Sequence, residues 1–178
     1  MTRGPELLRG KVWLFGDNIN TDLMVPSEVT YASPEKQARA VFQANRPVWV
    51  DEVGKGDVLI GGRNFGMGSS RPAARSLRNV GLSCMLAESL NGLFFRNDVN
   101  FGFIAMECPG VTGLFTEGDI AEIDMEAWRV TNGGTGKSLP IIPIPSELRS
   151  LMMEGGIFPH LEQLGLILPA APRPGTAA

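Results

Sequence analysis

Short apolar segments, separated by glycine, proline and polar residues, recur along the first two thirds of the chain. Apolar segments this short, bounded by such residues, predict buried strands. The predicted strands span residues 11–15, 57–61, 82–87 and 103–107. Between them, segments with helix start and stop signals predict helices at residues 33–45, 72–80 and 89–97. This alternation indicates parallel strands joined by right-handed crossovers.

The helix boundaries are indicated by capping residues. Ser33 offers a capping hydroxyl, Pro34 stands at the first helical position, and Glu35 lies near the positive end of the helix dipole. That helix should end ahead of the next proline. Gly81 ends the second helix, and Phe94 lies on the apolar face of the third.

The last third of the chain has a different pattern. Residues 119–124 and 128–131 predict a strand pair, and the glycine-rich segment 132–136 predicts a turn. Residues 140–144 predict another short strand, and Ser146 should cap a helix that ends at two consecutive glycines. A β-rich portion is therefore added to the strand–helix core.

The elements together predict a mixed α/β fold, with a single domain over residues 1–168. The tail at residues 169–178 consists of small residues and proline and is predicted to be disordered.

The composition narrows the possible functions. A chain of 178 residues can bury a substantial core, and 43% hydrophobic and 20% charged residues are typical of globular domains. The net charge of −3 gives no electrostatic reason to expect nucleic acid. No apolar run approaches the roughly 20 residues that span a bilayer, and the first residues lack the apolar core of a signal peptide. We therefore expect a cytoplasmic protein with no membrane partner.

Two cysteines, Cys84 and Cys108, lie in apolar segments and are expected to be buried thiols. A zinc or iron–sulfur site needs three or four convergent ligands. Two cysteines and one histidine do not supply such a set locally, so this chain is expected to hold no metal. Any metal chemistry would depend on a group held by another chain.

The segment most suggestive of chemistry is residues 62–71, between a predicted strand and a predicted helix. Gly66 and Gly68 allow unusual backbone angles and close approach of a ligand. Ser69 and Ser70 present hydroxyls near a helix N-terminus, where free N–H groups favour an anion. Arg71 adds a guanidinium that can grip a carboxylate with two hydrogen bonds.

Taken alone, this segment is more typical of a capped helix start after a flexible loop. Its glycine spacing and its lack of a lysine exclude a dinucleotide fingerprint and a P-loop.

Several motifs occur along the sequence in the order that is typical of one protein family. The segment Asn64-Phe65-Gly66-x-Gly68-Ser69-Ser70-Arg71 resembles the signature of the aconitase swivel domain. Residues 15–22 and 94–102 resemble the opening motif and the central helix of isopropylmalate dehydratase small subunits. Further matches follow in the family's order at residues 118–119, 135–137 and 155–157. The resemblance runs from about Lys11 to Leu166 and implies an aconitase-type swivelling β/β/α domain with a mixed sheet.

The resemblance also implies an activity. Members of this family are hydro-lyases that remove and re-add water on small hydroxy-dicarboxylates or tricarboxylates. A [4Fe–4S] cluster in a large subunit acts on the leaving hydroxyl. The resemblance therefore implies an enzyme subunit that is inactive alone and joins that large subunit in a heterodimer or heterotetramer. A role in leucine biosynthesis, a branched-chain amino acid pathway, is the corresponding expectation.

Site residues follow from the positions that match the motif. The first serine, Ser69, corresponds to the catalytic base. Its pKa must be strongly depressed for this role, and a helix N-terminus and the neighbouring arginine act in that direction. Ser70 and Arg71 correspond to residues that hold substrate carboxylates, with Gly68 beside them. The opening loop is expected to face the same cleft; from it we take the candidate substrate-binding residues Asn18, Thr21 and Asp22, although such a loop can also be a polar turn stabilised by its own side chains.

The sequence departs from the family pattern at informative positions. Met67 stands where the family usually has a cysteine, and Pro72 and Ala73 stand where it continues with glutamate and histidine. That pair would brace the loop and Arg71, so its loss removes support. In this family, substrate specificity is set largely in the loop that here comprises residues 26–33, called the specificity loop below. It lacks the arginine–tyrosine pair followed by leucine that is typical of isopropylmalate enzymes.

These departures leave alternatives open. The chain could be a paralogue for a related acid (dimethylmalate-, citramalate- or homoaconitate-like), or a non-catalytic binding or regulatory subunit. An RNA-binding role finds no basic patch. Arg75 and Arg78 are expected on a solvated or subunit-facing surface, and His160 in a surface or packing role.

Overall fold

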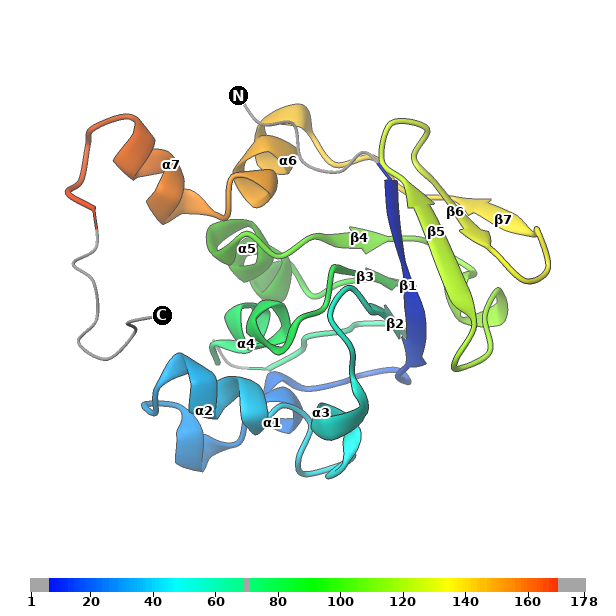
Figure 1. Ribbon diagram of the computed structural model, residues 1–178, viewed down its shortest axis with the longest axis horizontal. Coiled ribbons are helices and arrows are strands. Elements are labelled where there is room, and N and C mark those ends of the chain that lie inside the picture. Colours follow the sequence, from blue (N-terminus) through cyan, green and yellow to red (C-terminus); the bar gives the residue numbers. More distant parts are fainter. Residues whose placement is uncertain (1–6, 69–70, 170–178) are drawn as a thin grey trace.

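The computed structural model describes residues 7–68 and 71–169, which build a curled mixed sheet flanked by helices (Figure 1). Within these residues, seven strands pair in the order β4-β3-β2-β1-β5-β6-β7. The strands are β1 (Leu7–Leu14), β2 (Val58–Gly61), β3 (Cys84–Ala87), β4 (Ala105–Glu107), β5 (Ile120–Asp124), β6 (Arg129–Asn132) and β7 (Ser138–Pro140). The helices are α1 (Thr21–Met24), α2 (Pro34–Arg39), α3 (Trp49–Glu52), α4 (Ala73–Val80), α5 (Gly92–Phe101), α6 (Ser146–Met153) and α7 (Ile157–Gln163), with short 3₁₀ segments η1 (Ser27–Val29) and η2 (Val111–Gly113).

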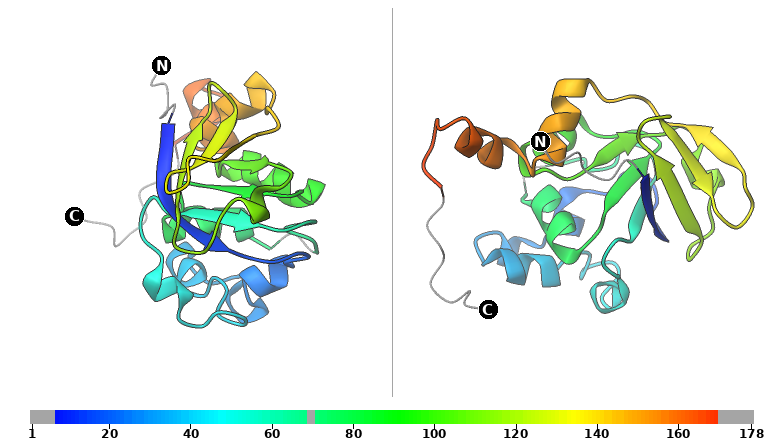
Figure 2. Two further views of the ribbon diagram at one scale, coloured as in Figure 1. Left: turned by 90° about the vertical axis from the view of Figure 1, so that its right-hand side faces the viewer. Right: turned by 45° about the horizontal axis from the view of Figure 1, so that its top comes forward.

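Strand β1 joins two differently built halves of the sheet. Its second half pairs in parallel with β2, and its first half pairs antiparallel with β5. β2 and β3 are buried along their whole length, as expected for parallel strands covered on both faces. β5 alternates between buried and half-buried positions, as expected for a strand with one covered face. The views show β5–β7 at one side of the molecule and α1–α3 at another (Figures 1 and 2).

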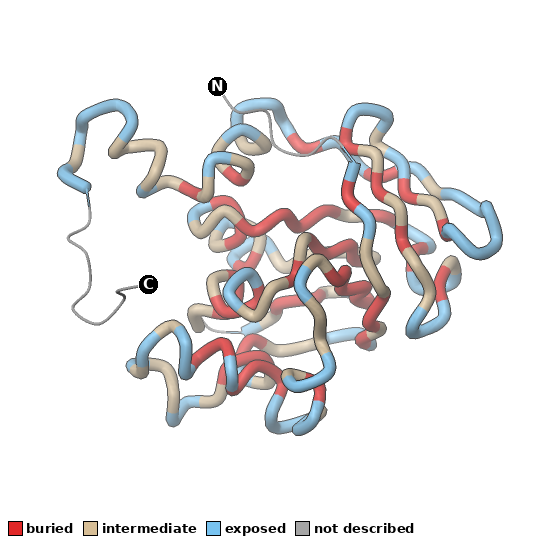
Figure 3. Tube along the Cα trace, viewed as in Figure 1, coloured by how far each residue is buried: buried red, intermediate tan, exposed pale blue. Residues whose placement is uncertain are grey.

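Two apolar clusters fill opposite faces of the parallel strands. Val12 and Val58 belong to one cluster, and Trp13 and Leu59 belong to the other, because successive side chains of a strand point to opposite faces. The first cluster continues onto β5, β6 and α6, and the second continues onto α1, α3 and α4. Buried positions accordingly follow the central strands (Figure 3). The sheet edge that carries the candidate site is thus anchored from both sides.

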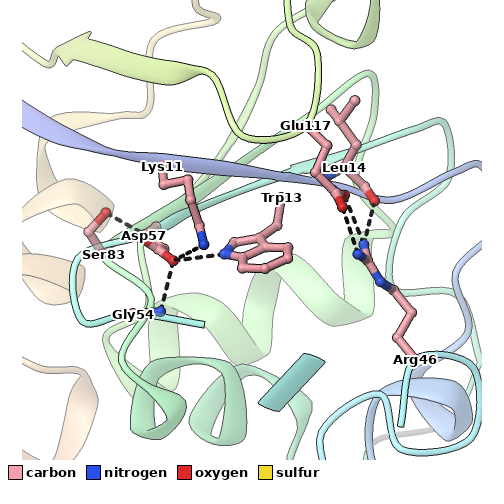
Figure 4. A network of polar contacts seen from close by, with 8 residues as sticks. All are labelled: Lys11, Trp13, Leu14, Arg46, Gly54, Asp57, Ser83 and Glu117. Atoms are coloured by element: carbon pink, nitrogen blue, oxygen red, sulfur yellow. Dashed lines mark hydrogen bonds and ion pairs between the residues drawn. The ribbon is translucent and has the colours of Figure 1, made fainter. Parts of the chain in front are cut away.

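A polar clamp fixes the carboxyl end of β1 (Figure 4). Arg46 donates from Nη1 and Nη2 to the Glu117 carboxylate at 2.9 and 2.7 Å, and Nη1 also donates to the Leu14 carbonyl at 3.2 Å. The Leu14 amide donates to Glu117 at 3.0 Å. The hydrogen bond from Arg46 holds the pKa of Glu117 below its ordinary value. Asp57, which accepts from the Trp13 indole at 2.7 Å, fixes an earlier part of the same strand.

One carboxyl group lies in the core without such partners. Asp98 on α5 is fully buried, and neither carboxylate oxygen has a hydrogen-bond partner in the part of the chain that the structure describes. Burial raises the pKa of Asp98 well above its ordinary value. Phe94, one turn earlier on the same helix, is equally buried, so the carboxyl occupies an apolar helix face.

The predicted fold class is confirmed, with a parallel strand–helix core and an added antiparallel portion. The strand pair at residues 119–131 and the turn after it are also confirmed. The domain limits at residues 1–168 stay a prediction. The tail prediction falls on residues 170–178 except for its first position, and so lies outside the described residues.

Several boundaries were wrong. The strand predicted at residues 140–144 is replaced by β7, which ends at Pro140, because prolines in the following segment remove ladder donors. The helix predicted to reach residue 45 ends at Arg39 and gives way to turns, with Phe42 in the left-handed region. Ser146 is the first residue of α6 rather than its cap. The short helices α1, α3 and α7 were missed.

Candidate functional site

The two loops expected to form the site lie side by side. Loop 16–22 follows β1 and segment 62–68 follows β2, and the carboxyl ends of adjacent parallel strands meet at one sheet edge. The backbone N–H of Asn18 donates to the Arg63 carbonyl at 2.8 Å. The N–H of Thr21 donates to the Met67 carbonyl at 2.9 Å. These bonds join the loops like two short strands.

Two asparagines in the left-handed region shape this junction. Asn18 has φ 55° and Asn64 has φ 52°, a conformation that asparagine tolerates better than most residues. The Asn64 side-chain amide donates to the Asn18 side-chain oxygen at 3.1 Å. The Asn64 backbone N–H donates to the Ser89 hydroxyl at 2.8 Å. Asn64 belongs to the signature segment but was not among the predicted site residues. Its place in that segment was the signal that could have identified it.

The glycines of the motif are required by close packing. Gly66 has φ 81° and Gly68 has φ 105°, both in the region that favours glycine. A Cβ on Gly66 would overlap the ring of Phe94, and a Cβ on Gly68 would overlap the side-chain amide of Asn20. Gly68 is therefore placed against the opening loop, as predicted for a site at this junction.

Among the predicted site residues, Arg71 is held by side-chain hydrogen bonds at two of its nitrogens. Its Nε donates to the Asp22 carboxylate at 2.7 Å, and its Nη1 donates to the Thr30 hydroxyl at 2.6 Å. The side chain is 23% exposed, so it is held within the protein while one edge reaches solvent. Thr30 belongs to the specificity loop but was not named as a site residue. Its contact with Arg71 depends on the fold and has no signal in the sequence.

The structure brings Asn18, Thr21, Asp22, Gly68 and Arg71 to one edge of the sheet. Thr21 is buried, whereas the Asp22 side chain is half exposed. Ser69 and Ser70 lie outside the described residues, so their roles stay predictions.

The positions that depart from the family pattern have their own contacts. Helix α4 begins at Ala73, and Pro72 before it gives no side-chain cap. The Ser76 hydroxyl donates to the Pro72 carbonyl at 2.8 Å. This hydrogen bond stabilises the first turn of α4, which has no N-terminal side-chain cap. The Met67 sulfur lies 3.6 Å from the Asn64 side-chain nitrogen. Met67 therefore packs inside the loop junction.

The donor groups of this chain do not fit a metal or an iron–sulfur cluster. Among residues 7–68 and 71–169, no group of three or more histidine, cysteine, aspartate or glutamate side chains could hold a metal ion. Cys84 and Cys108 are both buried, as predicted. Burial raises the pKa of the Cys84 thiol to about 12 and that of Cys108 to about 11, which disfavours the thiolate that a metal requires. In the described part of the chain, no helix is long and apolar enough to cross a membrane.

Comparison with known proteins agrees with this fold. The profile of the aconitase C-terminal domain matches residues 16–110. The isopropylmalate/citramalate isomerase small subunit of Methanocaldococcus jannaschii is 36% identical over 160 residues, which cover 89% of this chain and 95% of that protein. The 3-isopropylmalate dehydratase small subunit 1 of Thermotoga maritima is 38% identical over 162 residues, which cover 89% and 97%.

A solved structure extends the likeness to three dimensions. The crystal structure of 3-isopropylmalate dehydratase from Methanocaldococcus jannaschii matches with a TM-score of 0.83 and 26% identity, covering 90% of this chain and 96% of that one. A mixed sheet with a glycine-rich, arginine-bearing loop at its parallel edge thus defines the class, and the chain belongs to the aconitase family. Within that family it resembles the small subunits of 3-isopropylmalate dehydratase along nearly its whole length.

Proposed function

We propose that this chain is the small subunit of a hydro-lyase that dehydrates and rehydrates a small hydroxy-dicarboxylate. The observation that carries the proposal is the position of Arg71, held by Asp22 and Thr30 at the edge where the two loops meet. Its Nη2 has no hydrogen-bond partner among the described residues. A guanidinium fixed through two of its nitrogens keeps a third for a substrate carboxylate.

The remaining roles follow from the motif. Ser69 is the base that takes a proton from the carbon next to a carboxylate, and Ser70 binds a carboxylate beside Arg71. Gly68 lets the substrate approach the backbone. Asp22 orients the arginine, and Asn18 and Thr21 shape the wall of the site beside it. These groups bind, orient and deprotonate the substrate.

The reaction needs a second chain. The relatives are small subunits by name, and the donor groups described here do not fit a cluster. A large subunit of the aconitase type would therefore carry the [4Fe–4S] cluster, which supplies the Lewis acid for the leaving hydroxyl. We infer a heterodimer or a multiple of it, inactive when the small subunit is alone. The cytoplasmic location stays a prediction.

The substrate is inferred from the relatives and the specificity loop. One relative is named for both isopropylmalate and citramalate, and others for 3-isopropylmalate alone. 3-Isopropylmalate, and with it a role in leucine biosynthesis, is the first candidate. Citramalate is the second, because the loop at residues 26–33 departs from the isopropylmalate pattern. Tyr31, at its tip, is fully exposed.

The test is reconstitution with the cognate large subunit under anaerobic conditions, with the cluster intact. Hydration of isopropylmaleate and of citraconate is followed by loss of ultraviolet absorbance. Ser69→Ala should lower kcat by roughly a hundredfold or more, since a positioned general base contributes about that factor. Arg71→Lys keeps the charge but loses the planar fork, and should mainly raise KM.

The outcomes separate the proposal from its alternative. Full turnover in Ser69→Ala would remove that residue from the base role. A complex that assembles and binds the diacid but turns over no acid would favour the non-catalytic binding subunit. The replacement of the glutamate–histidine pair by Pro72 and Ala73 gives that second candidate its support.

A further inference from the structure

Three polar contacts in series connect helix α4 to Arg71, the candidate substrate-binding arginine, and a fourth continues from Arg71 to α1. Arg75 Nη2 donates to Gln37 Oε1 at 2.8 Å, and Gln37 Nε2 donates to the Thr30 carbonyl at 2.7 Å. The Thr30 hydroxyl accepts from Arg71 Nη1 at 2.6 Å. Arg71 Nε then donates to Asp22 at 2.7 Å. These contacts link α4, α2, the specificity loop and α1.

The middle link of this chain is a buried amide with only one possible orientation. Gln37 is 1% exposed. A guanidinium can only donate, so the amide oxygen must face Arg75; a carbonyl can only accept, so the amide nitrogen must face Thr30. Both ends of this buried amide are therefore satisfied by residues from other elements, and removing it would leave two partly buried groups without this partner.

The outer link is also held in place. The Arg75 guanidinium lies 5.6 Å from the centre of the Phe101 ring, within the range of a cation–π contact. Its Nε is buried and has no hydrogen-bond partner in the described part of the chain. Arg75 is thus partly buried and held by several contacts, and the expectation that it faces solvent or another subunit stays a prediction.

This chain of contacts lies where the family's own bracing is missing. Pro72 and Ala73 occupy the positions of the glutamate and histidine that would support Arg71 from its own helix. Support for Arg71 instead comes through Thr30, from α2.

We propose that Gln37 and Arg75 are positioning residues that hold the specificity loop so that Thr30 orients Arg71 for substrate binding. The inference rests on the proposed function, in which Arg71 binds a substrate carboxylate. It assigns the two residues an effect on substrate affinity and none on the proton-transfer step.

The kinetic test uses Gln37→Leu and Arg75→Gln in the reconstituted complex. Losing a buried hydrogen bond to the loop should raise KM for the diacid by roughly three- to tenfold. The value of kcat should change less than about twofold, because the base is untouched. Arg75→Lys, which keeps a donor, should recover part of the affinity. Arg78→Gln is the matched control: Arg78 also lies on α4 and donates to two carbonyls, but on Phe101 and Gly155, outside the chain of contacts.

A second variant guards against poor folding. Thr30→Val removes only the hydroxyl that Arg71 uses and leaves the buried amide in place. It should raise KM by a similar factor. Combining it with Gln37→Leu should add little, because both changes act on the same contact.

A third readout does not depend on activity. The amides of Thr30 and Ala32 donate to the Ser27 and Val29 carbonyls at 3.2 and 3.0 Å, so amide hydrogen exchange reports loop order. In the full-length chain, Gln37→Leu should speed exchange in residues 26–33 by roughly threefold or more. Arg78→Gln should leave it unchanged.

The results separate the two claims. Unchanged exchange and unchanged KM in Gln37→Leu, beside a raised KM in Arg71→Lys, overturn the positioning inference alone. An unchanged KM in Arg71→Lys overturns the proposed function, because the guanidinium is then no substrate ligand. A raised KM in Gln37→Leu together with a normal KM in Arg78→Gln supports the inference.

Discussion

Replacement of Asp98 by asparagine should make this protein more stable at neutral pH. Asp98 is fully buried, and both carboxylate oxygens lack hydrogen-bond partners among the described residues. A buried charge without a partner costs far more than its neutral form. Burial therefore raises the pKa of the folded-state carboxyl well above its ordinary value.

The sign of the pH dependence follows from proton linkage. The unfolded chain releases the Asp98 proton near pH 4, whereas the folded chain keeps it to a higher pH. Stability should therefore be greatest below pH 4 as far as this group is concerned. It should fall by about 1.4 kcal/mol for each pH unit above that, until the folded-state pKa is reached. At pH 7.5, Asp98→Asn should therefore be more stable than the unaltered protein by about 1 kcal/mol or more.

The assay is urea unfolding of the full-length chain between pH 5 and pH 8, followed by tryptophan fluorescence. For a domain of this size, each 1 kcal/mol also corresponds to a Tm shift of about 2–4 °C. Asp51→Asn, which alters an exposed carboxylate on α3, is the control and should not change the slope. If Asp98→Asn and the unaltered protein lost stability with the same slope, the carboxyl would have to be ionised and compensated in the folded state.

Three further results are expected. Gly66→Ala should destabilise the fold by about 2 kcal/mol or more, because it adds both a strained φ and an overlap with Phe94; a normal Tm would show that the loop can move aside. Burial raises the pKa of Glu88, but hydrogen bonds from a threonine and two backbone amides, with a nearby arginine, bring it below the ordinary value. The ionised Glu88 carboxylate should thus contribute to the free energy of unfolding above about pH 4.5, and this contribution should be lost as the pH falls further. Glu88→Gln should therefore reduce the loss of stability at acid pH in a series of unfolding measurements. An unchanged loss of stability at acid pH would contradict this. Cys84 and Cys108 should resist Ellman's reagent in the native chain and react in urea, because both thiols are buried with raised pKa values; fast native reaction at pH 8 would show that the core opens.

Much of the parallel core could be predicted from the sequence, because β2 and β3 are short, wholly apolar and bounded by glycine or polar residues. The end of the first long helix could not, since Phe42 takes a left-handed conformation to pack into the second apolar cluster. That is a tertiary effect overriding local preference. The strand predicted at residues 140–144 failed for a local reason, the prolines in it.

Part of the candidate site could likewise be predicted from the sequence, and part could not. Arg71, Asp22 and Gly68 were predicted from motifs, and the structure brings them together. The contact between Thr30 and Arg71, and the link through Gln37, join segments with no periodic relation in the sequence. Asp98 had a signal that was overlooked: it follows Phe94 by one helical turn, so it had to share the buried face.

The position of β1 at the junction of two half-sheets has a consequence for the newly made chain. Its first half pairs with β5, and the Arg9–Glu122 contact there spans 113 residues. At a synthesis rate of about 5–20 residues per second, the ribosome needs roughly ten seconds to deliver that partner. For that time the first strand is an open edge, the kind of surface that templates aggregation. Arg9 and Lys11 place two positive charges on this edge, and charged side chains on an edge strand disfavour such pairing.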